Sequence, residues 1–161
     1  MLKRVLVLSA AWIGLATVGL AQQAPGVSAQ DAIAARQASL DMSSITFRSM
    51  GDAMKAGREA KSQAYPAASL AKWAKALPGM FPPGTGQGET SADTQARVEV
   101  WKDRAGFERA AANYAAATAR LAEMAEANDT AGFTKQLDQV NQACAICHGS
   151  YKAGAQGPPR K

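Results

Sequence analysis

The chain has 161 residues, a length that suits one domain, and carries 18 Lys and Arg against 13 Asp and Glu, a formal charge of +5. So small an excess of positive charge does not point to nucleic acid, and it fits a solvated surface. The sequence also contains no Walker loop, dinucleotide-binding fingerprint or recognisable catalytic triad.

Residues 1–21 have the three parts of a secretory signal peptide. A charged start precedes an apolar run over residues 5–20, and a small-residue site ends at Ala21. The run is shorter than the ~20 apolar residues that a membrane-spanning helix requires. We therefore expect cleavage after Ala21, an exported mature domain over residues 22–161, and no stable membrane anchor.

Amphipathic patterns predict the first two helices. From about Asp31 to Gly57, small or apolar residues recur at alternating spacings of three and four, as on a bundle helix. A second helix is predicted from Lys61 to Leu77, with Pro66 near its first turn and Pro78 as its stop. Residues 78–88, rich in proline and glycine, then predict a long ordered loop that packs over another part of the protein.

Two more long helices are predicted in the second half of the chain. A short helical turn at Val98–Trp101 precedes Asp103, which can cap a third helix that runs to about Asn128. One face of that helix carries Phe107, Ala111, Tyr114, Thr118, Leu121 and Ala125. Asp129 or Thr130 starts the last helix. Its core-facing seam comprises Phe133, Leu137, Val140, Cys144, Cys147 and Tyr151. Four long helices without a convincing strand predict an all-α bundle.

The most specific motif, Cys144-Ala-Ile-Cys147-His148, lies in the last helix and is the attachment signature of c-type haem. Residues three and four apart share a helix face, so both thiols can form thioethers with one porphyrin while His148 reaches the iron. A disulfide or a redox C-x-x-C is the alternative, but a redox motif normally follows a strand, and none is predicted here. A zinc site needs four ligands, and this sequence offers three.

These residues resemble those of cytochrome c′, a class II c-type cytochrome. The resemblance covers the chain from about Asp31 to Lys152. Besides the haem motif it rests on Arg36-Gln37, Leu77-Pro78, Phe81-Pro-Pro-Gly-Thr85, Trp101 and Tyr151-Lys152. It implies an antiparallel, up-down-up-down four-helix bundle. It also implies one covalent haem c, held through Cys144 and Cys147 with His148 as the metal ligand.

The resemblance implies further roles in haem binding for three residues. Arg36 is expected near a haem propionate, Leu40 above the distal side of the iron, and Lys152 on the proximal side near His148. Because leucine cannot ligate iron, we expect five-coordinate iron. The alternative is a low-spin carrier with a methionine as sixth ligand. Met42 lies about 200° around the helix from Leu40, and Met80 would need the proline-rich loop to fold over the haem. Four aromatic residues can line the haem pocket or simply pack in the core: Phe47, Trp73, Phe81 and Tyr114.

The expected function is that of a periplasmic monohaem cytochrome that binds NO or CO, takes part in one-electron transfer, or does both. An enzymatic role is not expected, because the chain has one histidine and no obvious distal acid-base pair for peroxidase chemistry. Redox proteins and small gases are the expected partners. A homodimer through the first two helices is also expected, with small residues at outer positions that include Ala53, Ala67 and Ala68.

Overall fold

The computed structural model describes residues 26–154 of the chain. The predicted signal peptide, residues 1–21, lies outside the described residues. Four long helices make up the body of the protein: α1 (Ala29–Lys55), α2 (Ala64–Ala76), α4 (Arg104–Glu126) and α5 (Thr130–Tyr151). Three short helical elements join them: η1 (Ala60–Gln63), η2 (Leu77–Met80) and α3 (Glu99–Lys102). None of the helices described is long and apolar enough to cross a membrane.

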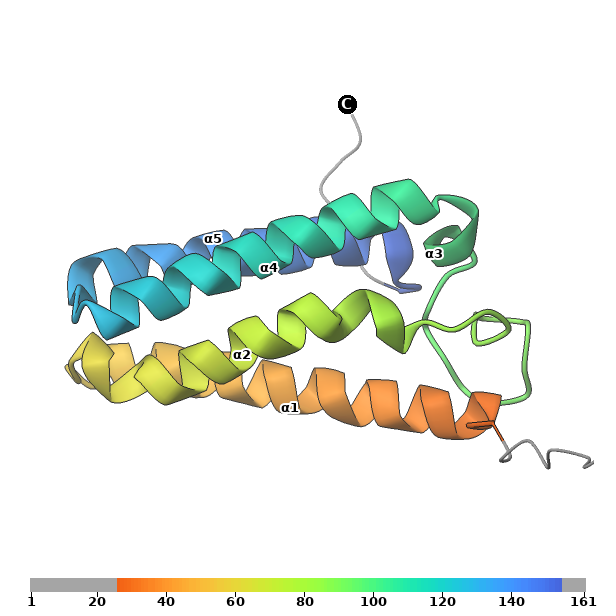
Figure 1. Ribbon diagram of the computed structural model, residues 1–161, viewed down its shortest axis with the longest axis horizontal. Coiled ribbons are helices and arrows are strands. Elements are labelled where there is room, and N and C mark those ends of the chain that lie inside the picture. The colour runs from red at the N-terminus through yellow and green to blue at the C-terminus, as the bar shows by residue number, and fades with distance from the viewer. Residues whose placement is uncertain (1–25, 155–161) are drawn as a thin grey trace, which may run out of the picture.

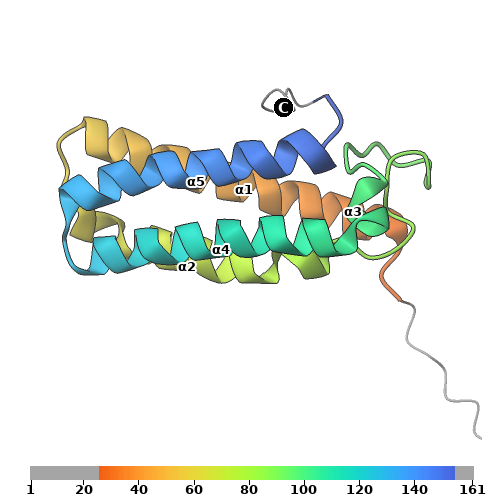
Figure 2. The ribbon, with the colours of Figure 1, turned by 90° about the horizontal axis from the view of Figure 1, so that it is seen from above.

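The long helices form an antiparallel four-helix bundle (Figures 1 and 2). Successive helices alternate in direction, so the predicted all-α, up-down-up-down architecture is confirmed. α1 and α2 form one layer, and α4 and α5 form the other. α4 packs closely against both α2 and α5, whereas α1 approaches α5 at far fewer points. The bundle is therefore open along the seam between its first and last helices.

Side-chain caps define the beginnings of three helices. Asp103 and Asp129 accept hydrogen bonds from the backbone N–H groups of Gly106 (3.1 Å) and Gly132 (2.9 Å), so both predicted caps are confirmed. Asp31 lies in the first turn of α1, in agreement with the predicted start, and the helix itself begins at Ala29. Ser28 is the N-cap, and its Oγ accepts from the backbone N–H of Asp31 at 3.1 Å. The helix dipole favours an acidic residue at the position of Asp31.

The predicted second helix is broken into three pieces. The α-helical part ends at Ala76, and Pro78 lies inside the 3₁₀ turn η2 that follows. Proline lacks the N–H that would continue the α-helical bonding, whereas a short 3₁₀ turn accommodates it near its start. Pro66 lies in the first turn of α2, as predicted, where no intrahelical N–H is needed.

The core lies between the predicted apolar faces. All six residues of the predicted α4 stripe are buried. On α5, four seam residues are buried, while Cys144 and Cys147 are only half-buried. Ala67 was predicted as an outer position, which was wrong, because it is fully buried in the main core. Ala53 and Ala68 are half-buried. The buried residues form a main cluster and a smaller second cluster of Val100, Phe107 and Tyr151.

Candidate haem site

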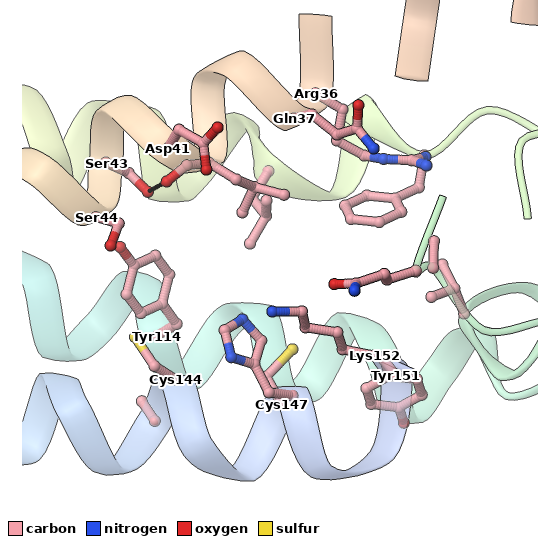
Figure 3. A pocket seen from close by; sticks show the side chains of 18 of the residues that line it. Arg36, Gln37, Asp41, Ser43, Ser44, Tyr114, Cys144, Cys147, Tyr151 and Lys152 are labelled. Carbon is pink, nitrogen blue, oxygen red and sulfur yellow. Dashed lines mark hydrogen bonds between the residues drawn. The ribbon is translucent and has the colours of Figure 1, made fainter. Parts of the chain in front are cut away.

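A cavity of about 930 Å³ opens beside the two cysteines, between α1 and α5. α1 runs along one side of this cavity and α5 along the other, as Figure 3 shows. Side chains from α2 and α4 close its back, and residues 93–96 lie at one end. Its volume is at the upper end of the range of roughly 300–1,000 Å³ that is typical of ligand pockets. The gap between the first and last helices can therefore hold a large flat group.

The α5 wall brings together the residues of the haem-attachment motif. Cys144, Cys147 and His148 all line the cavity, because Cys147 and His148 follow Cys144 by three and four residues and so lie near its face of α5. Burial raises the pKa of both thiols, that of Cys147 to about 11, with Cys144 adding to the effect at Cys147. His148 is exposed in the open cavity, although neighbouring atoms partly desolvate its ring. That desolvation, followed by the charge of Lys152, lowers the pKa of His148.

The α1 wall faces this motif with Leu40. Leu40 lines the cavity and packs partly against the core. No methionine lies among the residues that line the cavity within the described part of the chain. Met42 points to solvent and is 64% exposed, and Met80 lines a separate, smaller pocket. Leu40, which cannot bind metal, thus lines the cavity on the α1 side, together with Asp41 and Phe47.

Arg36 lies one turn before Leu40 and is held by the loop that follows α2. Arg36 is 3% exposed, although its side chain lines the cavity. Nη1 donates to Thr85 Oγ1 (2.9 Å) and to the Met80 carbonyl (3.5 Å). Nη2 donates to the Thr85 carbonyl (3.0 Å) and to Thr94 Oγ1 (2.9 Å). The guanidinium also lies over the Phe81 ring, 4.5 Å from its centroid. A solvated surface charge, the simpler interpretation of an arginine here, is thereby excluded.

The surroundings of Arg36 fit an anion in the cavity. None of its hydrogen-bond acceptors is a carboxylate, and no ion pair of the described residues includes it. Burial lowers its pKa. A buried cation without a counter-charge is costly, and an anionic group on a bound ligand would offset that cost. Two thiols, one imidazole and one buried guanidinium around a single apolar cavity match the attachment points, axial position and propionates of haem c.

Aromatic side chains complete the apolar walls. Phe47, Trp73, Phe81 and Tyr114 all line the cavity and also pack against the core, so both predicted roles apply at once. Trp73 and Tyr114 meet edge to face, with their ring centroids 6.1 Å apart. The side chain of Lys152 reaches back along α5 into the cavity (Figure 3). Every residue that the resemblance implicated in haem binding thus lines one cavity.

Two buried threonines at this site were not predicted as functional residues. Thr85 and Thr94 hold the guanidinium of Arg36 from positions 49 and 58 residues further along the chain. Thr85 belongs to the loop motif on which the resemblance rests. The motif marked this position, but it did not indicate that Thr85 binds Arg36. Thr94 lies in a polar stretch with no pattern that distinguishes it from Thr90 or Ser91.

Comparison with known proteins agrees with this geometry. The sequence model of the family described as cytochrome C′ matches residues 31–152. Cytochrome c′ of Rhodospirillum rubrum is 29% identical over 153 residues, which cover 94% of this chain and 99% of the relative. Cytochrome c′ of Rubrivivax gelatinosus is 36% identical over 72 residues, or 45% of this chain and 54% of the relative.

Solved structures show the same fold. The crystal structure of cytochrome c′ from Rubrivivax gelatinosus matches with a TM-score of 0.69 and 28% identity, covering 77% of this chain and 96% of the other. A ferrous variant of cytochrome c′ from Alcaligenes xylosoxidans with bound NO matches with a TM-score of 0.68 and 24% identity, covering 78% of this chain and 95% of the other. From the family match, with the bundle and the cavity around the C-x-x-C-H motif, we conclude that the chain belongs to the cytochrome c′ family.

Proposed function

We propose that this protein is a periplasmic monohaem c-type cytochrome that binds small gases such as NO and CO through a five-coordinate iron. Members of the family bind haem c, carry electrons or bind gases, and are not enzymes in the usual sense. The family's homologues are periplasmic. The observation that carries the proposal is the cavity itself, in which His148 lies on one wall and Leu40 on the other, with no methionine between them. Haem c supplies a redox-active iron that also binds diatomic ligands.

Residues of α5 attach and orient the cofactor. The thiols of Cys144 and Cys147 provide two covalent anchors on one helix face, which fixes the cofactor against α5. The imidazole of His148 would ligate the iron, and desolvation of the ring, which lowers the pKa of His148, favours the neutral form that ligates metal. One turn of α5 would therefore supply both thiol anchors and the metal ligand.

Residues of α1 shape the opposite face. Arg36 supplies a fixed cation for a propionate carboxylate, since its guanidinium is already held in place by the loop. Leu40 would present an apolar side chain to the bound haem from the α1 side of the cavity. An apolar group there admits uncharged diatomics and donates no hydrogen bond that would favour polar O₂. The proposed selectivity for NO and CO follows from the apolar side chain of Leu40 on the α1 side of the cavity.

Lys152 provides a second cation on the His148 side. Its side chain reaches into the cavity, and it lowers the pKa of His148. Lysine acts as a point charge, unlike the planar, forked guanidinium of arginine. We therefore propose that Lys152 acts on the proximal face mainly through its charge.

The relatives support gas binding. Several solved structures of the Alcaligenes xylosoxidans cytochrome c′ are nitric oxide complexes, and these chains share the fold of this protein. In this chain, Leu40 lines the α1 side of the cavity with a side chain that cannot ligate iron.

One-electron transfer is the second candidate function. Ala145 and Ile146, which lie between the two cysteines, are both exposed, and Ile146 is 56% exposed. A redox partner can thus approach within a few atoms of the attachment site. Electron transfer needs no vacant coordination position, so this role is compatible with gas binding.

The direct test is an absorption spectrum of the purified, exported protein before and after addition of NO or CO, together with haem staining after denaturing electrophoresis. We expect a high-spin spectrum that changes on adding either gas, and a haem stain that is absent from the Cys144→Ala, Cys147→Ala double variant. Retention of haem by that variant through denaturation would refute covalent attachment. A low-spin, CO-resistant spectrum that changed when Met42 or Met80 was replaced would refute the five-coordinate iron.

A further inference from the structure

A short backbone segment, residues 93–97, connects the two walls of the cavity, and we call it the strap. At its beginning, the strap contacts α1. Gln37 Nε2 donates to the Asp93 carbonyl at 3.0 Å, and Arg36 Nη2 donates to Thr94 Oγ1 at 2.9 Å. Thr94 is 6% exposed, so the second of these bonds is shielded from water. The strap therefore holds Arg36 and Gln37, two consecutive polar residues of α1, at the end of the cavity where the strap lies.

At its other end the same strap pairs with the residues that follow the haem motif. The backbone N–H of Arg97 donates to the Tyr151 carbonyl at 3.0 Å, and the N–H of Ala153 donates to the Gln95 carbonyl at 2.8 Å. Between them, Ala96 and Lys152 form an antiparallel bridge. This pairing fixes the backbone of Lys152 one turn after His148.

Among the described residues of the strap, Thr94 is the one whose side chain hydrogen-bonds to a cation that lines the cavity. Its hydroxyl accepts from Arg36 and also from the backbone N–H of Ala96 at 3.2 Å. The hydroxyl oxygen thus links the guanidinium of Arg36 directly to the backbone that is paired with Lys152. All four hydrogen bonds of Arg36 use Nη1 and Nη2, which leaves Nε–H available to a group in the cavity.

We infer that Thr94 is a positioning residue that fixes the Arg36 cation against the bound haem, and that the strap sets the positions of Arg36 and Lys152 together. The inference rests on the proposed haem site. It goes beyond that proposal because it gives Thr94, which would not itself touch the haem, a role in setting the electrostatic field at the iron. A fixed positive charge nearby favours the reduced, less positive state of the iron. Loss of the Thr94 hydroxyl frees the guanidinium, weakens its hold on a propionate and lowers the midpoint potential.

The test compares midpoint potentials of the full-length holoprotein by spectroelectrochemical titration. Thr94→Val removes the hydroxyl at nearly constant volume, and we expect a shift to lower potential. Thr94→Ser keeps the hydroxyl and should restore the wild-type value. Thr90→Val is the matched control, because the Thr90 hydroxyl accepts only from the backbone of Ala92. If Thr94→Val does not accumulate as folded protein, Thr94→Ala takes its place.

A double-mutant cycle separates positioning from a general structural effect. If Thr94 acts through Arg36, Thr94→Val should cause no further shift in an Arg36→Leu background. An unchanged potential in haem-loaded Thr94→Val, or an equal shift with and without Arg36, would overturn the inference while leaving the proposed function intact. Wild-type protein without covalently attached haem would instead overturn the proposed function.

Discussion

The hydroxyl of Tyr151 donates a hydrogen bond of 2.8 Å to Oδ2 of Asp103, and so joins the end of the haem-motif helix to the N-cap of α4. The other carboxylate oxygen of Asp103 caps α4 through the N–H of Gly106. These two bonds hold the pKa of Asp103 below its ordinary value of 3.8, and the bond from Tyr151 has the larger effect. The carboxylate is thus stabilised in its charged form by the folded protein.

Replacement of Tyr151 by phenylalanine should make stability less dependent on pH in the acid range. A depressed carboxyl pKa contributes stability above the unfolded value, and that contribution is lost as pH falls through the folded value. The difference in melting temperature between wild type and Tyr151→Phe should therefore be largest near neutral pH and should shrink below about pH 4. Thermal unfolding over a pH series measures it. Tyr65→Phe is the control, since Tyr65 is 83% exposed, and a pH-independent difference would contradict this account.

Substitutions of Leu40 should control access to the iron. Leu40→Ala removes bulk from the α1 wall, so CO and NO should bind faster in stopped-flow measurements. Leu40→Met places a thioether on the same wall, and we expect a shift towards a low-spin spectrum and weaker CO binding. Met42→Ala is the matched control on the same helix, because Met42 is 64% exposed and does not line the cavity. Equal rates of CO binding in Leu40→Ala and wild type would show that Leu40 does not restrict access to the iron.

Loss of the Asp129 cap should destabilise the haem-motif helix at its start. Asp129 accepts from the N–H of Gly132 at 2.9 Å, and replacement of such a cap by alanine costs about 1 kcal/mol. Asp138→Ala, at an exposed position of the same helix, should stay within about 0.5 kcal/mol of wild type. Chemical denaturation of both variants gives the comparison. Equal stability of the two variants would mean that the cap contributes little.

Self-association through the outer face of α1 and α2 is a further prediction. Met42 and Ile45 lie three residues apart on α1, so they share a face, and they are 64% and 54% exposed. We expect a dimer at micromolar concentration in sedimentation experiments, and a shift towards monomer in the Met42→Glu, Ile45→Glu double variant. A wild-type protein that sediments only as a monomer would refute the dimer.

Local sequence patterns were sufficient to predict the bundle. The α4 stripe from Phe107 to Ala125 and the caps Asp103 and Asp129 depend on residues within a turn or two of each other, and all were predicted correctly. The motif at Cys144 to His148 is local as well, and its three residues line the cavity, while their role in haem attachment stays a prediction. The fold could therefore be predicted from local patterns.

The remaining details depend on contacts between distant parts of the chain. Nothing near Thr94 in the sequence indicates that it meets Arg36, which lies 58 residues earlier. Ala67 was placed on the outside because alanine carries little information about which helix face it occupies, and its burial is decided by packing against α4.

The two walls of the cavity belong to the first and the last of the long helices. Neither local hairpin, α1 with α2 or α4 with α5, contains both walls, so the pocket arises only from the most sequence-distant helix contact in the bundle. Closing the long loop between these two helices costs chain entropy, and contacts of this kind slow folding. We therefore expect the helix that carries the C-x-x-C-H motif to form against α4 before α1 docks on it, so that the cavity closes last.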